Sequence, residues 1–213
     1  MYVPDDFALD DAAAVAEVIR RHGFAVLVTA VDGRAVASHL PFLFDPDRGA
    51  KGTLRAHMAR ANPQWRDLAR LGETGGEALV VFQGPHAYVS PNWYGAQPAV
   101  PTWNYVAVHA AGTPRLVEEP GQVRAMLERL VRTHEAGLSE PWSLGSQDEA
   151  FVARMMRGIV AFEIPVARLE AKAKLNQNKR PEERRGAAAG LRAGGDPLAD
   201  QVAALMENPA FGA

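Results

Sequence analysis

Apolar residues along this chain follow the spacing of strands in some segments and of helices in others. Residues 24–31 form an uninterrupted apolar, β-branched run, which predicts a strand buried on both faces. Alternation of apolar and polar positions resumes over 36–44 and predicts a second strand. The Asp32-Gly33 dipeptide between them favours a two-residue hairpin, because both residues tolerate positive φ. Pro41 has no amide proton to donate, so we expect the second strand at a sheet edge.

The rest of the chain adds strands and helices with short connections. The further predicted strands are 53–57, 77–83, 102–118 (one strand or a hairpin, broken near Gly112) and 158–164. The predicted helices, with the residues that cap or end them, are 10–22 (Asp10 or Asp11), 63–71 (Asn62, Gly72), 122–134, one ending at Arg157 (Ser146 with Glu149 as a capping box), and a short one after Asp196. Alternating βαβ units are missing, which predicts an α+β fold around a β-barrel or sandwich.

Composition narrows the class of protein. The 213 residues are 47% hydrophobic and 23% charged, which is typical of a soluble globular chain, and the formal net charge is −2. Such a charge creates no field that would draw the whole molecule onto DNA or anionic lipid. The sequence has no cysteine, which excludes disulfides and thiolate metal sites. No apolar stretch reaches the roughly 18 residues of a membrane helix. With no signal-peptide pattern at the start, we expect a cytoplasmic protein without membrane contact.

Familiar catalytic and nucleotide-binding motifs are missing, and the six histidines do not follow metal-ligand spacings. We therefore expect no catalytic residue and no metal site. The segment 57–64 is more informative, because it joins a strand to a helix start, where free amides and the helix dipole favour an anion. Arg60 and Asn62 could bind phosphate oxygens there, and the alternative is an N-cap with a solvated arginine.

The stretch 84–101 is rich in proline, aromatic and polar residues, which predicts a functional loop. Its aromatic residues and those of 102–105 could stack on a planar ligand whose edge binds short polar side chains. Tryptophan and tyrosine are equally typical of dimer interfaces. The residues concerned are Tyr88, Ser90, Asn92, Trp93, Trp103, Asn104 and Tyr105.

A basic segment lies near the C-terminal end, where residues 168–192 contain eight Lys or Arg and three Glu, a local charge of +5. It has three interpretations: a solvated strand and turn, a contact with DNA, or a group in which Lys172, Lys174 and Gln177 reach a cofactor or a partner subunit. No helix-turn-helix pattern precedes it.

Six segments, taken in order, resemble the PaiB family, described as FMN-binding negative transcriptional regulators. They are MYVPDDF at 1–7, ASHLPF at 37–42, HMARANPQW at 57–65, FQGPHAYVSPNWY at 82–94, VPTWNYVAVHAAG at 100–112 and KLNQNKRPEER at 174–184. The resemblance implies a split β-barrel with peripheral helices, like those of pyridoxamine phosphate oxidase and flavin reductase. It further implies a homodimer with FMN at the interface. The chain would be a single domain, 1–213, on which the basic segment and tail helices of 168–213 pack.

The same resemblance implies where the flavin lies. Segments 38–42 and 57–62 would meet its ribityl phosphate, and 103–105 would approach it from the second protomer. Combined with the chemistry above, the predicted cofactor-binding residues are His39, Leu40, His57, Arg60, Asn62, Ser90, Trp93, Trp103, Asn104, Lys174 and Gln177.

The function implied by the resemblance is that of an FMN-binding negative regulator, with DNA contact through the basic segment as one possible partner interaction. A second hypothesis is a flavin-dependent oxidoreductase or flavin reductase, in which FMN supplies the redox chemistry and no protein base is needed. A third is a cofactor-free or haem-binding module of the same fold.

Overall fold

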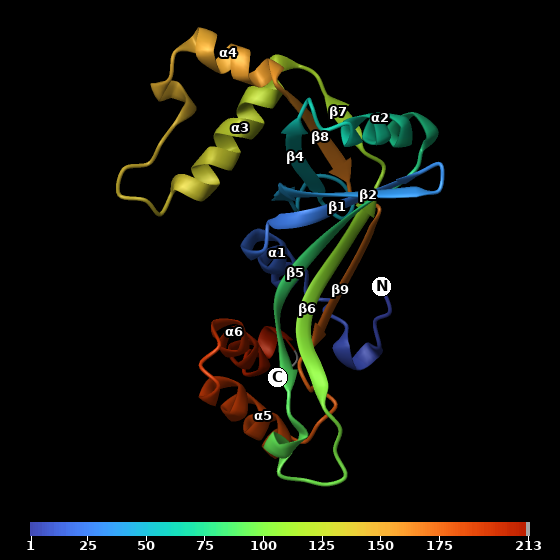
Figure 1. Ribbon diagram of the computed structural model, residues 1–213, viewed down its shortest axis with the longest axis vertical. Coiled ribbons are helices and arrows are strands. Elements are labelled where there is room, and N and C mark those ends of the chain that lie inside the picture. Colours follow the sequence, from blue (N-terminus) through green and yellow to red (C-terminus); the bar gives the residue numbers. More distant parts are fainter. Residues whose placement is uncertain (212–213) are drawn as a thin grey trace. The chain divides into compact units, whose positions relative to one another are not determined.

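The computed structural model describes residues 1–211, which form two compact units (Figure 1). Unit 1 comprises Met1–His22, Val81–His109 and Leu169–Ala213, and unit 2 comprises Gly23–Val80 and Ala110–Arg168. Unit 1 contains η1 (Asp5–Phe7), α1 (Ala12–Arg21), η2 (Pro91–Tyr94), α5 (Pro181–Ala193), α6 (Pro197–Met206) and η4 (Pro209–Phe211). Unit 2 contains β1 (Phe24–Val31), β2 (Arg34–Pro41), β3 (Leu43–Asp45), β4 (Thr53–Ala59), α2 (Gln64–Thr74), β7 (Arg115–Val117), α3 (Pro120–Glu135), η3 (Leu144–Ser146), α4 (Glu149–Arg157) and β8 (Ile159–Pro165).

Three strands have residues in both units: β5 (Ala78–Val89), β6 (Thr102–Gly112) and β9 (Arg168–Lys174). The strands are ordered β2-β1-β5-β6-β9 in one sheet and β3-β4-β8-β7 in the other. The pairs β1–β2, β3–β4, β4–β8 and β7–β8 are antiparallel. Antiparallel sheets with helices packed on them confirm the predicted α+β fold.

The first hairpin forms as the sequence predicts. Asp32 and Gly33 both have positive φ, 53° and 75°, and the register pairs Val31 with Arg34 across a two-residue turn. Pro41 ends β2, which lies at the edge of its sheet, so no ladder bond is lost there. The prediction that β1 is buried on both faces is wrong. One face, which includes Leu27, is buried, whereas the other face is only partly buried and Phe24 on it is 70% exposed.

The core of unit 2 is built by alternation along the strands. Its largest fully buried apolar side chains are Leu27, Leu54, Met58, Leu68, Val80, Phe162 and Ile164. Helix α3 packs on the four-stranded sheet, where its Val123 and Met126 contact Leu43 of β3 and Ala161 of β8. The amphipathic pattern of 122–134 therefore predicts both the helix and the face that it buries.

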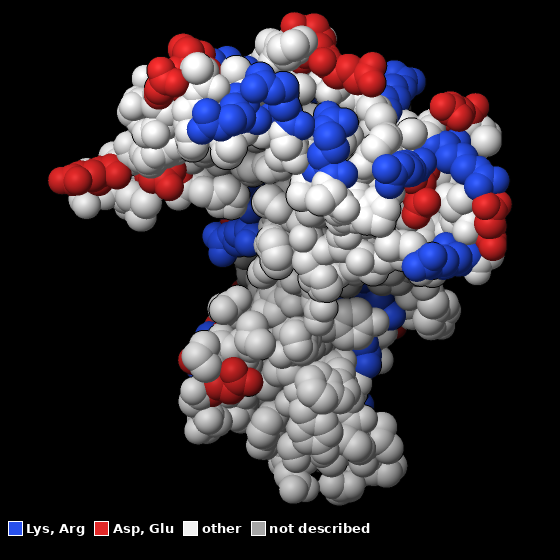
Figure 2. Space-filling view, turned by 45° about the horizontal axis from the view of Figure 1, so that its top comes forward, with Lys and Arg blue, Asp and Glu red and all other residues white. Residues whose placement is uncertain are grey.

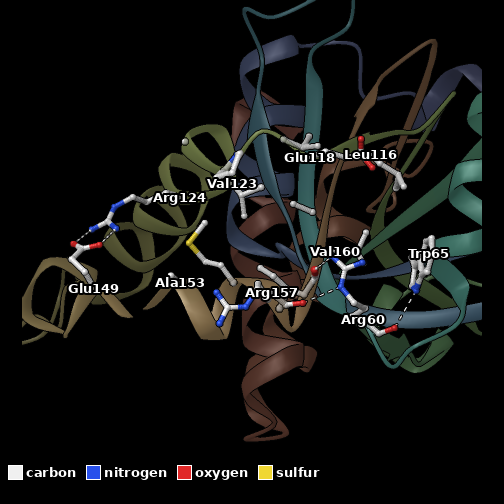
Figure 3. Close-up of a pocket in the computed structure, with 16 residues that line it drawn as sticks. Arg60, Trp65, Leu116, Glu118, Val123, Arg124, Glu149, Ala153, Arg157 and Val160 are labelled. Atoms are coloured by element: carbon white, nitrogen blue, oxygen red, sulfur yellow. Dashed lines mark hydrogen bonds and ion pairs between the residues drawn. The ribbon is translucent and has the colours of Figure 1, made fainter. Parts of the chain in front are cut away.

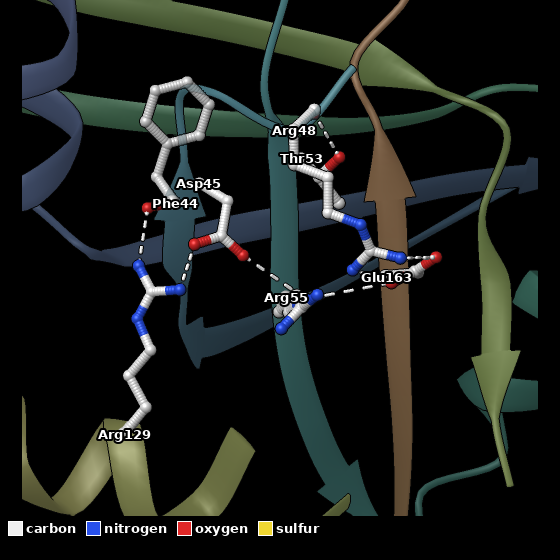
Figure 4. Close-up of polar contacts among 7 residues, drawn as sticks. All are labelled: Phe44, Asp45, Arg48, Thr53, Arg55, Arg129 and Glu163. Atoms are coloured by element: carbon white, nitrogen blue, oxygen red, sulfur yellow. Dashed lines mark hydrogen bonds and ion pairs between the residues drawn. The ribbon is translucent and has the colours of Figure 1, made fainter. Parts of the chain in front are cut away.

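Charged side chains also join α3 to this sheet (Figure 4). Asp45 of β3 accepts a hydrogen bond from Arg129 of α3 and lies 3.4 Å from Nε of Arg55 on β4. Glu163 of β8 receives Arg48 at 2.7 Å and lies 3.7 Å from Arg55. Both carboxylates are largely shielded from solvent, so their pairing offsets the desolvation that burial costs.

The predicted ends of α2 and β5 are wrong, because Gly72 and Gly84 lie inside these elements, where the backbone packs closely against other segments. Helix α2 continues through Gly72, where a Cβ would lie 2.7 Å from the Pro114 carbonyl oxygen, and it ends at Gly75 in the left-handed region (φ 72°). Strand β5 continues through Gly84 to Val89, so the predicted loop begins only at residue 90. A Cβ at Gly84 would lie 3.0 Å from the backbone of β6, so glycine permits this close pairing.

Helix α5 was not predicted, since the sequence analysis assigns no helix to the basic segment 168–192, and the other remaining helices differ from prediction in their caps. Asp11 caps α1 and Asp196 caps α6, each accepting a backbone hydrogen bond. The cap of α4 is Asp148, whose carboxylate accepts from Phe151 N, so the predicted Ser146 cap is wrong. The break near Gly112 separates β6 from β7, which lie in different sheets and form no hairpin. Residues 212–213 of the predicted tail lie outside the described residues.

Candidate functional site

The predicted cofactor-binding residues fall into two groups, one in each unit. Unit 2 holds His39, Leu40, His57, Arg60 and Asn62. Unit 1 holds Ser90, Trp93, Trp103, Asn104, Lys174 and Gln177. Each group is described by itself below.

In unit 2 the turn between β4 and α2 is joined to β2 by Asn62. Its Nδ2 donates to Ser38 Oγ at 3.0 Å, and its Oδ1 accepts from Gln64 N at 3.0 Å. Ser38 immediately precedes His39, which is exposed, and Leu40, which is half-buried. The structure thus brings together the two segments that the resemblance assigns to the ribityl phosphate.

Gln64 supports this junction from inside, and the sequence reasoning missed it. The side chain is 1% exposed, and Nε2 donates to Thr29 Oγ1 at 3.2 Å and to Val36 O at 3.0 Å, which ties α2 to β1 and β2. The available signal was its spacing of four and seven residues from Leu68 and Leu71, which places all three on the buried face of α2.

Arg60 is exposed but its guanidinium is held in place. Nε donates to Arg157 O and Nη2 to Ile159 O, both at 2.9 Å, while Trp65 Nε1 donates to Arg60 O at 3.1 Å. Nη1 has no partner within the described chain, so its two N–H groups remain for an anion. Because Asn62 accepts from Gln64 N and Arg60 is exposed, the alternative of an N-cap with a solvated arginine also stays a prediction. Arg60 and Trp65 line a cavity of unit 2 (Figure 3).

His57 is half-buried on β4, opposite Ala161 of β8. Its Nδ1 is buried and has no hydrogen-bond partner among residues 1–211. Burial lowers the pKa of His57, because the charged imidazolium would lose its hydration. His39 differs, since its exposed ring stacks on Phe24 with centroids 6.2 Å apart.

The pH dependence of stability follows from His57. A histidine whose folded-state pKa lies below its unfolded value stabilises the fold above the unfolded pKa, about 6.5, and that contribution is lost as pH falls through the folded pKa. We expect urea-derived unfolding free energies to fall less between pH 8 and pH 5.5 in His57→Gln than in the wild type. Burial also lowers the pKa of His22, so a residual slope should persist. An unchanged slope in His57→Gln, or an equal change in the exposed-site control His134→Gln, would contradict the assignment.

In unit 1 three aromatic side chains form an open surface on β5 and β6, which we call the aromatic ledge: His86, Tyr88 and Trp103. The Trp103 ring centroid lies 6.3 Å from that of His86 and 6.1 Å from that of Tyr88. Trp103 is 54% exposed and Tyr88 48% exposed. Planar, solvent-open rings of this kind suit stacking against another flat ring system or a protein surface.

Trp93 is not part of the aromatic ledge. It lies against α5, where a Cβ at Gly190 would come within 2.3 Å of the Trp93 ring and a Cβ at Gly186 within 2.2 Å of its carbonyl oxygen. Ser90 caps η2, with Oγ accepting from Asn92 N at 3.3 Å. Trp93 thus packs η2 onto α5 while Ser90 caps η2, and the role of both residues toward the flavin stays a prediction.

The other three predicted residues of unit 1 are engaged within it. Asn104 is fully buried, with Nδ2 lying 3.4 Å from Met206 Sδ and Oδ1 without a partner in the described part of the chain. Lys174 donates to Thr102 Oγ1 on β6. Gln177 uses both ends of its amide on backbone atoms, accepting from Leu175 N at 2.7 Å and donating to Ala173 O at 2.6 Å. Contact of these residues with the flavin also stays a prediction.

Taken by itself, the group of unit 2 offers the Asn62 amide and the Arg60 guanidinium just before α2, which suits a phosphate. Taken by itself, the aromatic ledge of unit 1 suits a flat ring. Within residues 1–211 no group of three His, Asp or Glu side chains is placed to hold a metal ion. None of the helices described is long and apolar enough to cross a membrane.

The fold is that of a split β-barrel. A flavocytochrome from Azotobacter vinelandii superposes with a TM-score of 0.60 at 14% identity, over 78% of this chain and 68% of that one. An FAD and haem binding protein from Mycobacterium smegmatis gives a TM-score of 0.60 at 15% identity, over 84% and 78%. At such identities these likenesses show the fold.

The chain belongs to the family described as "Putative FMN-binding domain", whose model matches residues 1–168. It is 32% identical to the Bacillus subtilis protease synthase and sporulation protein PAI 2 over 98% of this chain and 97% of that protein. The predicted resemblance to the PaiB family is thereby confirmed. The cofactor of this domain is FMN.

Proposed function

We propose that the protein is a homodimeric, FMN-binding negative regulator whose flavin lies in the seam between two copies. The observation that carries the proposal is the aromatic ledge, which leaves Trp103 and Tyr88 about half exposed on a sheet surface. Large exposed rings on a sheet are typical of surfaces that a partner covers. Phe24, 70% exposed at the start of β1, adds apolar surface in unit 2.

The two groups of residues have complementary chemistry, which supports a shared site. The β4–α2 turn supplies donors for a phosphate, and the ledge supplies a ring surface for the isoalloxazine. In the arrangement we propose, one copy contributes the turn and the other copy contributes Trp103. A flavin bound in this way would couple cofactor loading to dimerisation, which is a means of regulating contact with a further partner.

The regulatory part of the proposal rests on the PaiB resemblance, and the relative from Bacillus subtilis is named for protease synthesis and sporulation. Several cations of the basic segment 168–192 are engaged within unit 1. Lys172 is 6% exposed and donates to Tyr2 O at 3.2 Å, Arg180 pairs with Glu183 at 3.1 Å, and other contacts hold Lys174, Arg184 and Arg192. Direct DNA contact through this segment would therefore depend on a small part of its charge.

The cations best placed for that contact are Lys179 and Arg185. Neither forms an ion pair with a carboxylate in the described residues, although Lys179 lies 5.1 Å from the Tyr94 ring centroid. Each cation that neutralises a phosphate contributes about −0.9 to the slope of log K against log salt. We expect the FMN-loaded protein to bind duplex DNA with a shallow slope, which becomes shallower still in the Lys179→Gln/Arg185→Gln double variant.

Fluorescence anisotropy with labelled genomic promoter fragments measures these slopes, and Lys51→Gln, an exposed lysine of unit 2, is the matched control. Absence of binding at about 50 mM salt would remove direct DNA contact from the proposal. A slope that the double variant leaves unchanged would place the contact elsewhere. The mass of the protein in solution and its affinity for FMN, measured on the same samples, test whether it is a dimer that binds flavin.

A further inference from the structure

The helices of unit 2 enclose a cavity of about 650 Å³ beside β7 and β8 (Figure 3). Its walls come from α3, α4, the two strands and the β4–α2 turn, all within unit 2. Pockets that bind small ligands have volumes of roughly 300–1,000 Å³, so this one is large enough for a molecule of that kind. It has no residue in common with the aromatic ledge, and Arg60 is its one predicted flavin residue among those described.

The body of the cavity is apolar. Val117 of β7, Ile159 of β8 and Met156 of α4 contribute to its lining, and all three pack on the core cluster beneath α3. None of the described residues that line it is Ser, Thr, Asn, Gln, Tyr or His. A flavin ring presents several polar atoms along its edge, and this lining supplies no neutral polar side chain to bind them. The cavity therefore suits a ligand with an apolar body.

Two arginines of the lining have no carboxylate partner among the described residues. Arg60 keeps its Nη1 free of partners in the described chain while two carbonyls hold the rest of its guanidinium. Arg157 is exposed, and no hydrogen bond or ion pair involves its guanidinium in residues 1–211. In contrast, Arg124 is neutralised by Glu149, with both N–O distances below 3 Å.

The remaining carboxylate of the lining, Glu118, does not cancel this charge. Figure 3 shows Glu118 on the side of the cavity away from Arg60 and Arg157. Figure 2 shows basic and acidic side chains interspersed over the face that it presents. The unpaired charge of Arg157 thus favours an anionic group at its side of the cavity.

We propose that this cavity is a second ligand site, separate from the flavin site, for a small amphipathic anion: an apolar body with one carboxylate. The carboxylate binds the Arg157 guanidinium, and the body lies on Val117, Met156 and Ile159. A neutral apolar ligand would leave the Arg157 guanidinium unused. This inference does not depend on the regulatory role proposed above, because every contact comes from one unit of one chain.

The test uses the full chain saturated with FMN and sodium octanoate as the probe. Isothermal titration should detect octanoate binding, and 1-octanol, which lacks the charge, should bind more weakly. Arg157→Gln should raise the octanoate dissociation constant about tenfold, the size of effect expected from one charge-assisted hydrogen bond. Ala153→Trp, on the α4 wall, should abolish binding by filling the cavity. Arg154→Gln is the matched control, since Arg154 lies over the Phe151 ring and outside the lining.

Several results would overturn the proposal. Release of FMN on adding octanoate, followed by flavin absorbance after gel filtration, would identify the cavity as the flavin site itself. Absence of heat with the wild-type protein would show that no such ligand site exists. If Arg154→Gln weakens octanoate binding as much as Arg157→Gln does, the effect comes from the general surface charge and not from the cavity. Should Ala153→Trp fail to fold, Arg157→Gln and its control still decide the outcome.

Discussion

Trp103→Ala is expected to lower both the dimer fraction and the affinity for FMN. The ring is 54% exposed on β6, flanked by His86 and Tyr88, and in the proposed seam it lies where the second copy and the flavin meet. Truncation of a central tryptophan in an interface costs at least about 2 kcal/mol, which corresponds to more than a tenfold loss of affinity. Because one side chain serves both contacts, the two losses should occur together.

Sedimentation equilibrium gives the dimer constant, and quenching of flavin fluorescence gives the FMN dissociation constant. Trp142→Ala is the matched control, because Trp142 is 45% exposed in the loop between α3 and α4 and lies apart from the aromatic ledge in the sequence. Trp103→Phe should restore part of both quantities, since it keeps an aromatic surface. If Trp103→Ala is a stable monomer that binds FMN as tightly as the wild type, the proposal that the flavin lies between two copies is refuted. If it is a dimer with weakened FMN binding, Trp103 contacts the flavin but the subunit interface lies elsewhere.

Gly190→Ala is expected to destabilise the protein although alanine is the better helix former. A Cβ at this position of α5 would come within 2.3 Å of the Trp93 ring, so either η2 or the ring must move. Overpacking of this kind costs about 1–3 kcal/mol. The intrinsic helix preference for alanine over glycine, about 1 kcal/mol, opposes that loss and is too small to cancel a contact this close.

A double-mutant cycle in urea separates the two effects. In a Trp93→Ala background the ring that the new Cβ would contact is absent, so Gly190→Ala should be neutral or stabilising. The cost of Gly190→Ala would then depend on Trp93, which helix propensity alone cannot explain. Gly137→Ala is the control, because nothing lies within 4 Å of a Cβ built there. Equal costs of Gly190→Ala in both backgrounds would show that Trp93 is not what the glycine accommodates.

The candidate site was partly predictable from sequence. Arg60 and Asn62 stand out because they follow a strand and precede a helix, and the structure places both at that junction. Gln64, the buried residue that holds the junction together, was missed because its partners lie 28 to 37 residues away in the chain. Trp93 was predicted to bind the cofactor, which stays a prediction, and its packing on α5 could not be predicted because it depends on a helix far along the chain.

What the sequence alone determined was local. The hairpin at Asp32-Gly33, the edge position of Pro41 and the buried face of α3 follow from backbone preferences and from the periodicity of apolar residues, which act between near neighbours. Only the tertiary structure decided that Gly72 lies inside a helix, that β5 continues through Gly84, and that Arg60 is held by two carbonyls beside a cavity. Those features arise where segments distant in the chain come within a few ångströms, and no local pattern encodes which segments those are.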